Sequence, residues 1–314
     1  MMLVSCSRSS NSGQSVPEVA FSADSAYRYI SEQVAFGPRV PGSAAHEACA
    51  AYLREQLRRF GAEVHVEQGC LPNYAGEPQQ IYNIVGRYAP EAKRRILLCA
   101  HWDSRPWTDQ EENYDDRMQP VLGANDGASG VGVLLEVARQ LSIVHCPLSM
   151  GVDVVFFDAE DMGTPSFYTG KEREDTWCLG SQLWSQRVKQ EGRAGEYAFG
   201  ILLDMVGAPE AVFPKEYYSS YYANAYVERV WRAAQQAGYG RYFRDVKSYP
   251  LTDDHYYVNT IAGIPCIDII HYDAQSGTGF AHYWHTQHDN MDNISRATLD
   301  AVGRTVMATI EATR

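Results

Sequence analysis

The sequence predicts a single α/β domain in which a central, mixed and mostly parallel β-sheet is flanked by helices. Short apolar runs, such as RILLCA at residues 95–100 and GVDVVFFD at 151–158, are typical of strands covered on both faces. These runs alternate with segments whose apolar residues recur at helical spacing, the order expected for a parallel sheet with helical crossovers. The chain has 314 residues, 45% of them hydrophobic, and shows no internal repeat or domain boundary after residue 21.

The first two elements are amphipathic helices, expected over residues 22–36 and 43–60. Ser22 or Asp24 is expected to cap the first helix and Ser43 the second, because such side chains accept a hydrogen bond from a free N–H group of the first turn. The sequence GPRVPG at residues 37–42 separates the two helices, since proline and glycine interrupt helical structure.

The remaining elements are predicted from the helical spacing of apolar residues and from the alternating or continuous apolar runs of strands. Residues 63–67 alternate like a half-exposed strand, residues 70–79 form a loop, and a second strand follows at 80–88. Residues 106–122, 208–218 and 239–259 are expected to be loops or irregular. Further strands are expected at residues 95–100, 151–158, 197–203 and 264–270, and further helices at 131–142, 179–189, 219–237 and 295–313.

Charge and composition exclude two classes of protein. The formal net charge is −12 and there is no basic run, so the chain lacks the positive surface with which proteins bind nucleic acids. No apolar stretch reaches the length of a membrane span. We therefore expect no nucleic-acid partner and no transmembrane segment.

Seven cysteines are present, and six of them lie beyond residue 40 without any CxxC spacing. Several stand in apolar runs, where cysteine usually behaves as a small hydrophobic residue. We expect mostly free, buried thiols, although one disulfide is compatible with an exported protein.

The stretch GANDGASGVG at residues 123–132 holds a single carboxylate, Asp126, among very small residues. It precedes the helix predicted at 131–142, so Asn125 or Asp126 can cap that helix and the helix dipole favours an ionised Asp126. The small neighbours are expected to leave room for a bound group. Taken alone, the same stretch is equally well explained as a capped turn.

Other predicted strands are followed by acidic residues or histidine. His101 and Asp103 follow the strand at 95–100, Glu160 and Asp161 follow the next, and Asp204 the one after. His285 lies in the loop beyond the last strand. Carboxylates crowded at one sheet edge must be protonated or neutralised by a cation. Mixed His and carboxylate ligands suit Zn²⁺, and three protein ligands with an open position are typical of a catalytic zinc site.

The motifs GANDGASG, FFDAED, LLDMVG, TDDH and YWHTQHDN, in this order, resemble those of the zinc-dependent glutaminyl-peptide cyclotransferases. This family comprises the animal-type glutaminyl cyclases and their bacterial relatives, and it is related to the M28 metallo-aminopeptidases. The resemblance runs from about residue 22 to the C-terminus. It implies conversion of an N-terminal Gln of peptides and proteins to pyroglutamate, with release of ammonia, by a monomer that holds one Zn²⁺.

The resemblance also assigns site residues. The metal ligands fall on Asp126, Asp161 and His285, and the proton shuttle falls on Glu160. The family usually has Glu-Glu where this chain has Glu160-Asp161, so one ligand is a methylene shorter, which leaves the metal distance open. The family implies a cis peptide between Asp126 and Gly127. Two further acids of the family fall on Asp204 and Asp253. Its pocket residues fall on Trp284, Trp177, His255 and His101.

Three other functions were weighed. A di-zinc M28 aminopeptidase would use His101, Asp126, Asp161, Asp204 and His285, all of which this chain has. The sequences TDDH, WHT and LLDMVGAP favour the cyclase over it. A non-catalytic binding module on the same fold is disfavoured because the metal residues are present, and a serine hydrolase because the Gly-x-Ser-x-Gly elbow is absent.

The N-terminal sequence predicts a lipid anchor. The sequence LVSC at residues 3–6 resembles a lipobox with Cys6 as the lipidated residue, and residues 7–16 are rich in Ser, Asn and Gly like a tether. Too few residues precede Cys6 for a full signal region, so we expect residues 1–21 to be a truncated lipoprotein signal and tether, and residues 22–314 to be the catalytic domain. These features predict an exported, periplasmic, membrane-anchored lipoprotein of a Gram-negative bacterium. A ragged cytosolic N-terminus is the alternative.

Overall fold

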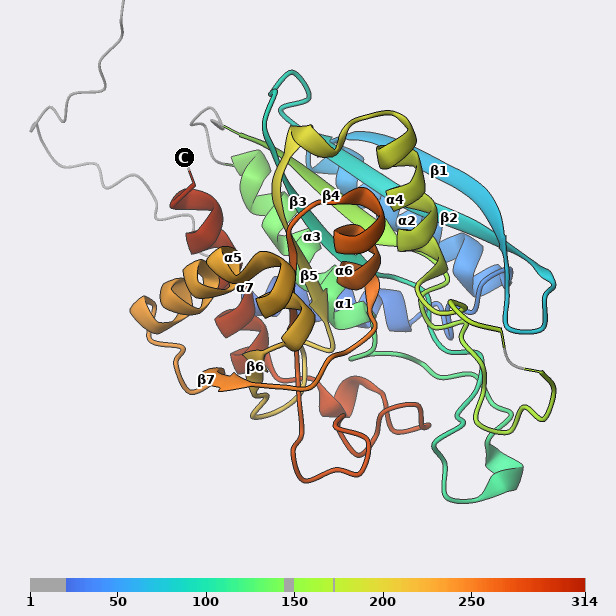
Figure 1. Cartoon of the computed structure of the whole chain (residues 1–314). Coiled ribbons are helices and arrows are strands. Elements are labelled where there is room, and N and C mark those ends of the chain that lie inside the picture. Colours follow the sequence, from blue (N-terminus) through green and yellow to red (C-terminus); the bar gives the residue numbers. More distant parts are fainter. Residues whose placement is uncertain (1–20, 144–149, 172, 314) are drawn as a thin grey trace, which may run out of the picture.

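The computed structural model describes residues 21–143, 150–171 and 173–313. A six-stranded sheet forms the centre of the molecule, in the order β1-β2-β4-β3-β5-β8 (Figure 1). The four strands β4, β3, β5 and β8 are parallel, and the hairpin β1–β2 is joined antiparallel to β4. This confirms the predicted fold class. The strands are β1 Glu63–Pro72, β2 Pro78–Tyr88, β3 Arg95–His101, β4 Gly151–Phe157, β5 Tyr197–Asp204 and β8 Cys266–Ile270.

Helices cover both faces of the sheet, as the fully apolar strands require. Along β3, the side chains of Ile96 and Leu98 join one apolar core, whereas Leu97 and Cys99 join the other. The first core includes residues of α1, α2, α3, α5 and α7, and the second includes residues of α4 and of the π-helix that follows α6. The helices are α1 Ala23–Val34, α2 Ala44–Arg59, α3 Ala128–Ile143, α4 Leu179–Gln190, α5 Tyr217–Gln236, α6 Asp254–Tyr257 and α7 Arg296–Glu311.

The predicted caps of the first two helices are confirmed. The Ser22 hydroxyl accepts a hydrogen bond from the N–H group of Ser25, and the Ser43 hydroxyl accepts one from His46. These bonds satisfy first-turn donors that have no partner inside the helix.

Three segments predicted as loops contain strands. Strand β1 continues to Pro72 and pairs with Pro78 of β2, so the loop expected at 70–79 is only the turn between them. A second, two-stranded sheet joins β6 (Phe213–Lys215) to β7 (Phe243–Lys247). Polar and proline residues in these segments resemble loop composition, and their backbone groups are satisfied only by the partner strand, which is adjacent for β1 and about 30 residues away for β6 and β7.

The folded part of the chain begins before residue 22. Phe21 is 4% exposed, and a side chain at position 303 of α7 would collide with its ring, so this residue packs against α7. Cys6 and Cys146 lie outside the described residues. The cysteines within them, Cys49, Cys70, Cys99, Cys178 and Cys266, are free and all but Cys70 are buried, which confirms that expectation. No helix in the described ranges has the length and apolarity to cross a membrane.

Candidate functional site

A cavity of about 520 Å³ lies where the parallel strands end. Parallel strands present their carboxyl ends at one edge, which explains why strand-end residues far apart in the sequence meet there. Two residues expected in the pocket, His101 and His255, do not line this cavity. The predicted residues that line it are Asp126, Glu160, Asp161, Trp177, Asp204, Asp253, Trp284 and His285.

Asp126, Asp161 and His285 form a group with the spacing of a zinc site. The His285 Nε2 atom lies 3.2 Å from Asp161 Oδ1 and 3.5 Å from Asp126 Oδ2. Tetrahedral ligands with bonds of about 2.0–2.1 Å to zinc are roughly 3.3 Å apart. The second oxygen of Asp161 is buried without a hydrogen-bond partner, as expected of an atom that a cation would satisfy. The shorter Asp161 side chain therefore reaches its neighbours, and these residues fit Zn²⁺.

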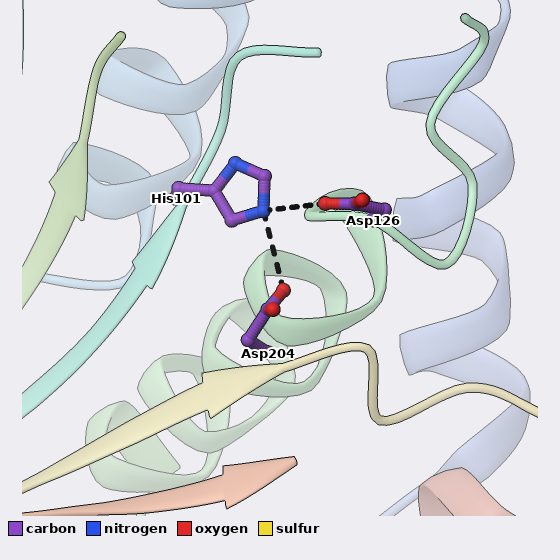
Figure 2. Close-up of side chains that lie close together, drawn as sticks. All are labelled: His101, Asp126 and Asp204. Atoms are coloured by element: carbon purple, nitrogen blue, oxygen red, sulfur yellow. Dashed lines mark hydrogen bonds and ion pairs between the residues drawn. The ribbon is translucent and has the colours of Figure 1, made fainter. Parts of the chain in front are cut away.

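His101 forms a different contact with the same aspartate (Figure 2). Its Nε2 atom lies 2.9 Å from Asp126 Oδ1 and 3.2 Å from Asp204 Oδ1. The shorter distance is a hydrogen-bond length and is less than the separation of two zinc ligands. His101 thus packs behind the cavity wall and joins Asp126 to Asp204.

Asp126 is held ionised by these two histidines. Burial opposes ionisation, but hydrogen bonding to His101 and His285 holds the pKa of Asp126 well below its ordinary value. The peptide between Asp126 and Gly127 is cis, as the family resemblance implied. Neither expected cap is found: the Asn125 side chain accepts a hydrogen bond from Gly207, and the Asp126 oxygens face the histidines.

The glycines beside Asp126 make room for protein atoms, which corrects the expectation of space for a bound group. A side chain at Gly127 would come within 2.3 Å of the His101 ring. One at Gly130 would come within 2.1 Å of the Leu203 carbonyl oxygen on β5. Small residues therefore let His101 and β5 approach the start of α3.

Glu160 lies at the edge of the cavity and is held by Cys178. The Cys178 Sγ atom lies 3.1 Å from Glu160 Oε1, and the backbone N–H of Cys178 donates to the carbonyl of Glu160 at 2.8 Å. Burial, reinforced by the Asp161 carboxylate and opposed by His101, raises the pKa of Glu160 well above its ordinary value. A carboxyl group whose pKa is raised can hold a proton beside the cavity and act as a general acid or base.

Two buried aspartates position the backbone of this site, and both were missed as site residues. Asp103 accepts hydrogen bonds from the N–H groups of Glu160 and Asp161, at 3.1 and 3.2 Å. Asp289 does the same for Asn125 and Asp126, at 2.7 and 3.1 Å. Burial, followed by the nearby Asp126 carboxylate, raises the pKa of Asp289 to about 7. In the sequence, Asp103 is marked by its place after the strand at 95–100, and Asp289 only by its place in the HDN motif.

Aromatic rings enclose His285. The Trp284 ring lies 3.6 Å from the His285 ring, and the Trp177 ring lies nearly parallel to it at 6.3 Å. Arg105 stacks on Trp177 at 4.6 Å and donates to the Asp161 carbonyl oxygen at 3.0 Å. The other nitrogen of His285, Nδ1, lies 3.3 Å from Asp109. A carboxylate in this position fixes the orientation of a metal-binding histidine.

The two further predicted acids, Asp204 and Asp253, both line the cavity, and a carboxylate oxygen of Asp253 lies within 4.8 Å of Glu160 and Cys178. Asp204 ends β5, and burial, opposed by His101, raises its pKa to about 7. Asp253 caps α6, and burial raises its pKa as well. His255 follows on α6 but turns into the interior, where its Nε2 atom lies 3.0 Å from Glu216. We therefore place His255 behind the wall that carries Asp253.

Comparisons with known proteins agree with this arrangement. The sequence model of peptidase family M28 matches residues 83–310. Glutaminyl-peptide cyclotransferase from Bos taurus is 24% identical over 289 residues, which cover 85% of this chain and 76% of that protein. The fold is similar to that of Tannerella forsythia glutaminyl cyclase, with a TM-score of 0.88, 51% identity, and coverage of 93% of this chain and 98% of that one. A Zn-dependent exopeptidase from Parabacteroides distasonis is also similar, with a TM-score of 0.89, 50% identity, and coverage of 94% and 99%.

Proposed function

Because this chain belongs to peptidase family M28 and shares half of its sequence with a bacterial glutaminyl cyclase, we propose that it is a glutaminyl-peptide cyclotransferase. It converts an N-terminal Gln of peptides to pyroglutamate and releases ammonia. The observation that supports this function best is the proton-exchanging Glu160 beside a group of residues that fits zinc, in one cavity with Asp204 and Asp253.

We further propose that one zinc ion is bound per chain. Asp126, Asp161 and His285 have the separations of zinc ligands, whereas His101 lies at hydrogen-bond distance from Asp126. In an M28 enzyme with two zinc ions, His101 and Asp204 would instead bind the second ion. The 2.9 Å contact of His101 with Asp126, which is shorter than the separation of two zinc ligands, favours the single-ion arrangement.

The reaction needs the substrate's α-amine to attack its own γ-carboxamide carbon, after which the C–N bond to the leaving ammonia breaks. A zinc ion at Asp126, Asp161 and His285 would supply Lewis acidity toward the γ-carbonyl. Glu160 accepts a proton from the attacking amine and returns it to the departing nitrogen, so no proton is gained or lost overall. Asp204 and Asp253, which line the same cavity, orient the amine. Holding the Gln side chain folded supplies much of the acceleration, since the attack is intramolecular.

Metal content and product together distinguish this function from a di-zinc peptidase. We expect about one zinc per chain, ammonia release from a Gln-peptide, and no hydrolysis of an aminoacyl anilide. Elemental analysis and the two assays on the same preparation measure this. As a matched variant, Asp204→Asn should keep its zinc while losing activity. Two zinc ions in the wild type, one in Asp204→Asn, and anilide hydrolysis would instead establish an aminopeptidase.

Cys178 is a positioning residue for Glu160. Its side chain is buried, and it stands in the left-handed region (φ +55°) at the start of α4 without capping that helix. Burial, followed by the Glu160 carboxylate, raises the pKa of the thiol well above its ordinary value, so it stays protonated and can donate. Removing a hydrogen bond to a group that ionises typically costs about 1.5–3 kcal/mol.

We expect Cys178→Ala to lower kcat about tenfold at unchanged KM, and Cys178→Ser to recover most of the loss because a hydroxyl also donates. Steady-state ammonia release measures both constants. Cys49→Ala, at a buried cysteine of α2 remote from the cavity, is the control for lost packing. Equal kcat for wild type and Cys178→Ala would show that the thiol does not position Glu160.

Lipid attachment at Cys6, a periplasmic location and a monomeric state stay predictions from the sequence. Cys6 lies outside the described residues, so the proposal rests on the LVSC motif and the tether-like composition that follows it. A lipid anchor at Cys6 would place the cyclase at a membrane surface and leave the catalytic domain free to meet exported peptides.

A further inference from the structure

A second cavity lies on the hairpin β1–β2, which forms the edge of the sheet opposite to β8 (Figure 1). It has a volume of about 460 Å³, within the range of about 300–1,000 Å³ that is usual for sites that bind small molecules. Among the residues that the structure describes, none lines both this cavity and the cavity of the candidate site. We call it the hairpin groove, because β1 and β2 form its floor and α2 forms its wall.

The floor and the wall of the hairpin groove follow from the local structure. Val66 of β1 and Ile84 of β2 stand directly opposite each other, so their side chains lie on the same face of the sheet and give the floor an apolar centre. His46, Ala50 and Arg54 of α2 recur at every fourth position, so one stripe of the helix faces that floor. The cavity is therefore formed by regular elements on both sides.

His46 is fixed before any ligand binds. Its Nε2 atom lies 2.8 Å from Asp158 Oδ1, and its ring stacks on that of Trp102 at a centroid distance of 4.1 Å. Its Nδ1 atom accepts a hydrogen bond from the N–H group of Gly42 at 3.5 Å, so the proton of the ring lies on Nε2. Both ring nitrogens are thus in use, and His46 contributes shape to the wall.

Glu47 and Arg54 place opposite charges at the two ends of the wall. They are seven residues apart on α2, which is nearly two turns, so they lie on one side of the helix and about 10 Å apart along its axis. Neither side chain has a hydrogen-bond or ion-pair partner in the part of the chain that the structure describes. The Nε atom of Arg54 is buried, and a buried donor usually has an acceptor, so we expect a bound group to supply one.

The rest of the lining has the donors and acceptors that a peptide requires. Gln68 and Gln80 both line the groove, and each primary amide can donate to and accept from a peptide group. The guanidinium of Arg54 matches a carboxylate, whose two oxygens can accept from two of its N–H groups. The carboxylate of Glu47 matches an ammonium group.

We propose that the hairpin groove binds a short peptide of about three residues, with its N-terminal ammonium group at Glu47 and its C-terminal carboxylate at Arg54. An extended chain advances about 3.3–3.6 Å per residue, so three residues span the distance of about 10 Å between the two charges. A single amino acid is too short to reach both ends, and a phosphate ester would be repelled by Glu47. This binding needs no N-terminal Gln and goes beyond the proposed cyclase function.

Isothermal titration calorimetry on the zinc-loaded protein tests this site with Ala-Ala-Ala, its C-terminal amide and its N-acetyl form. We expect saturable binding of Ala-Ala-Ala to wild type. The amide lacks the carboxylate and should bind about tenfold more weakly, the effect of one hydrogen bond to a charged group. The acetylated peptide lacks the ammonium group and should bind about threefold more weakly, because Glu47 is exposed.

Each charge of the groove should recognise one end of the peptide only. Arg54→Gln should bind Ala-Ala-Ala about tenfold more weakly than wild type and should no longer distinguish it from its amide. Glu47→Gln should lose the distinction between Ala-Ala-Ala and its acetylated form. Glu55→Gln and Arg59→Gln are the matched controls, because both side chains are exposed on α2 and do not line the groove.

No saturable binding of Ala-Ala-Ala to wild type, or equal affinity for the three peptides, would overturn this inference. A preference for free peptide ends that survives both groove variants would place the peptide elsewhere on the protein and would overturn it as well. The calorimetric measurement involves no turnover, so none of these outcomes bears on the cyclase function.

Discussion

Glu160→Gln is expected to abolish ammonia release while the protein keeps its zinc. Glutamine has nearly the same size and can still contact Cys178, but it cannot accept the proton of the attacking amine. General acid–base residues typically contribute a factor of about 10²–10⁴ in rate. Burial raises the pKa of Glu160, and Glu160 is not one of the three residues that have the spacing of zinc ligands. Its replacement should therefore lower kcat and leave the zinc content unchanged.

Single-turnover ammonia release and elemental analysis on the same sample measure this effect. Glu77→Gln provides a matched control, since Glu77 is exposed in the turn between β1 and β2 and lies outside the cavity. A Glu160→Gln protein with near-normal turnover would refute the proton-transfer role. A variant that lost zinc together with activity would show instead that Glu160 binds the metal.

Asp126→Ala is expected to lose zinc and activity together. One Asp126 oxygen has the zinc-ligand spacing to His285, and the other bonds to His101, so removal of the carboxylate takes away a ligand and the link to Asp204. Two remaining residues, Asp161 and His285, hold zinc far more weakly than three. Turnover should fall below detection after dialysis against a chelator.

Thermal unfolding with and without added zinc gives a readout that does not depend on turnover. A ligand that binds only the folded state raises the unfolding temperature of wild type, and the increase should disappear in Asp126→Ala. Glu77→Ala, in the exposed turn between β1 and β2, is the control for a general loss of charge. Full zinc occupancy in Asp126→Ala would refute the ligand assignment.

The fold could be predicted from the sequence because its main elements are encoded locally. The apolar runs that became β3 and β4 and the serine caps of α1 and α2 each depend on residues within a few positions of one another. The hairpin extension of β1 and the small β6–β7 sheet could not be predicted in this way. Their composition resembles that of loops, and for β6 and β7 the pairing partner also lies about 30 residues away.

The candidate site likewise combines features that could be predicted from the sequence with features that could not. The residues at strand ends and their order in the chain were sufficient to select Asp126, Glu160, Asp161 and His285 as site residues. The supporting contacts could not be predicted from the sequence, because they join residues that lie far apart in the chain. Asp103 accepts a hydrogen bond from Glu160, which is 57 positions away, and Asp289 accepts one from Asn125, which is 164 positions away. No local pattern records such pairs.

The sequence by itself determined the fold class, the cyclase and M28 resemblance, and the set of acidic and histidine residues that the site contains. Only the tertiary structure decided how those residues are divided. It placed His285 at ligand spacing from Asp126 and Asp161, but His101 at hydrogen-bond distance behind the wall. It also turned the Cys178 thiol toward Glu160. The physical reason is that side-chain direction depends on the packing of the whole sheet and its helices, whereas residue identity depends on the chain alone.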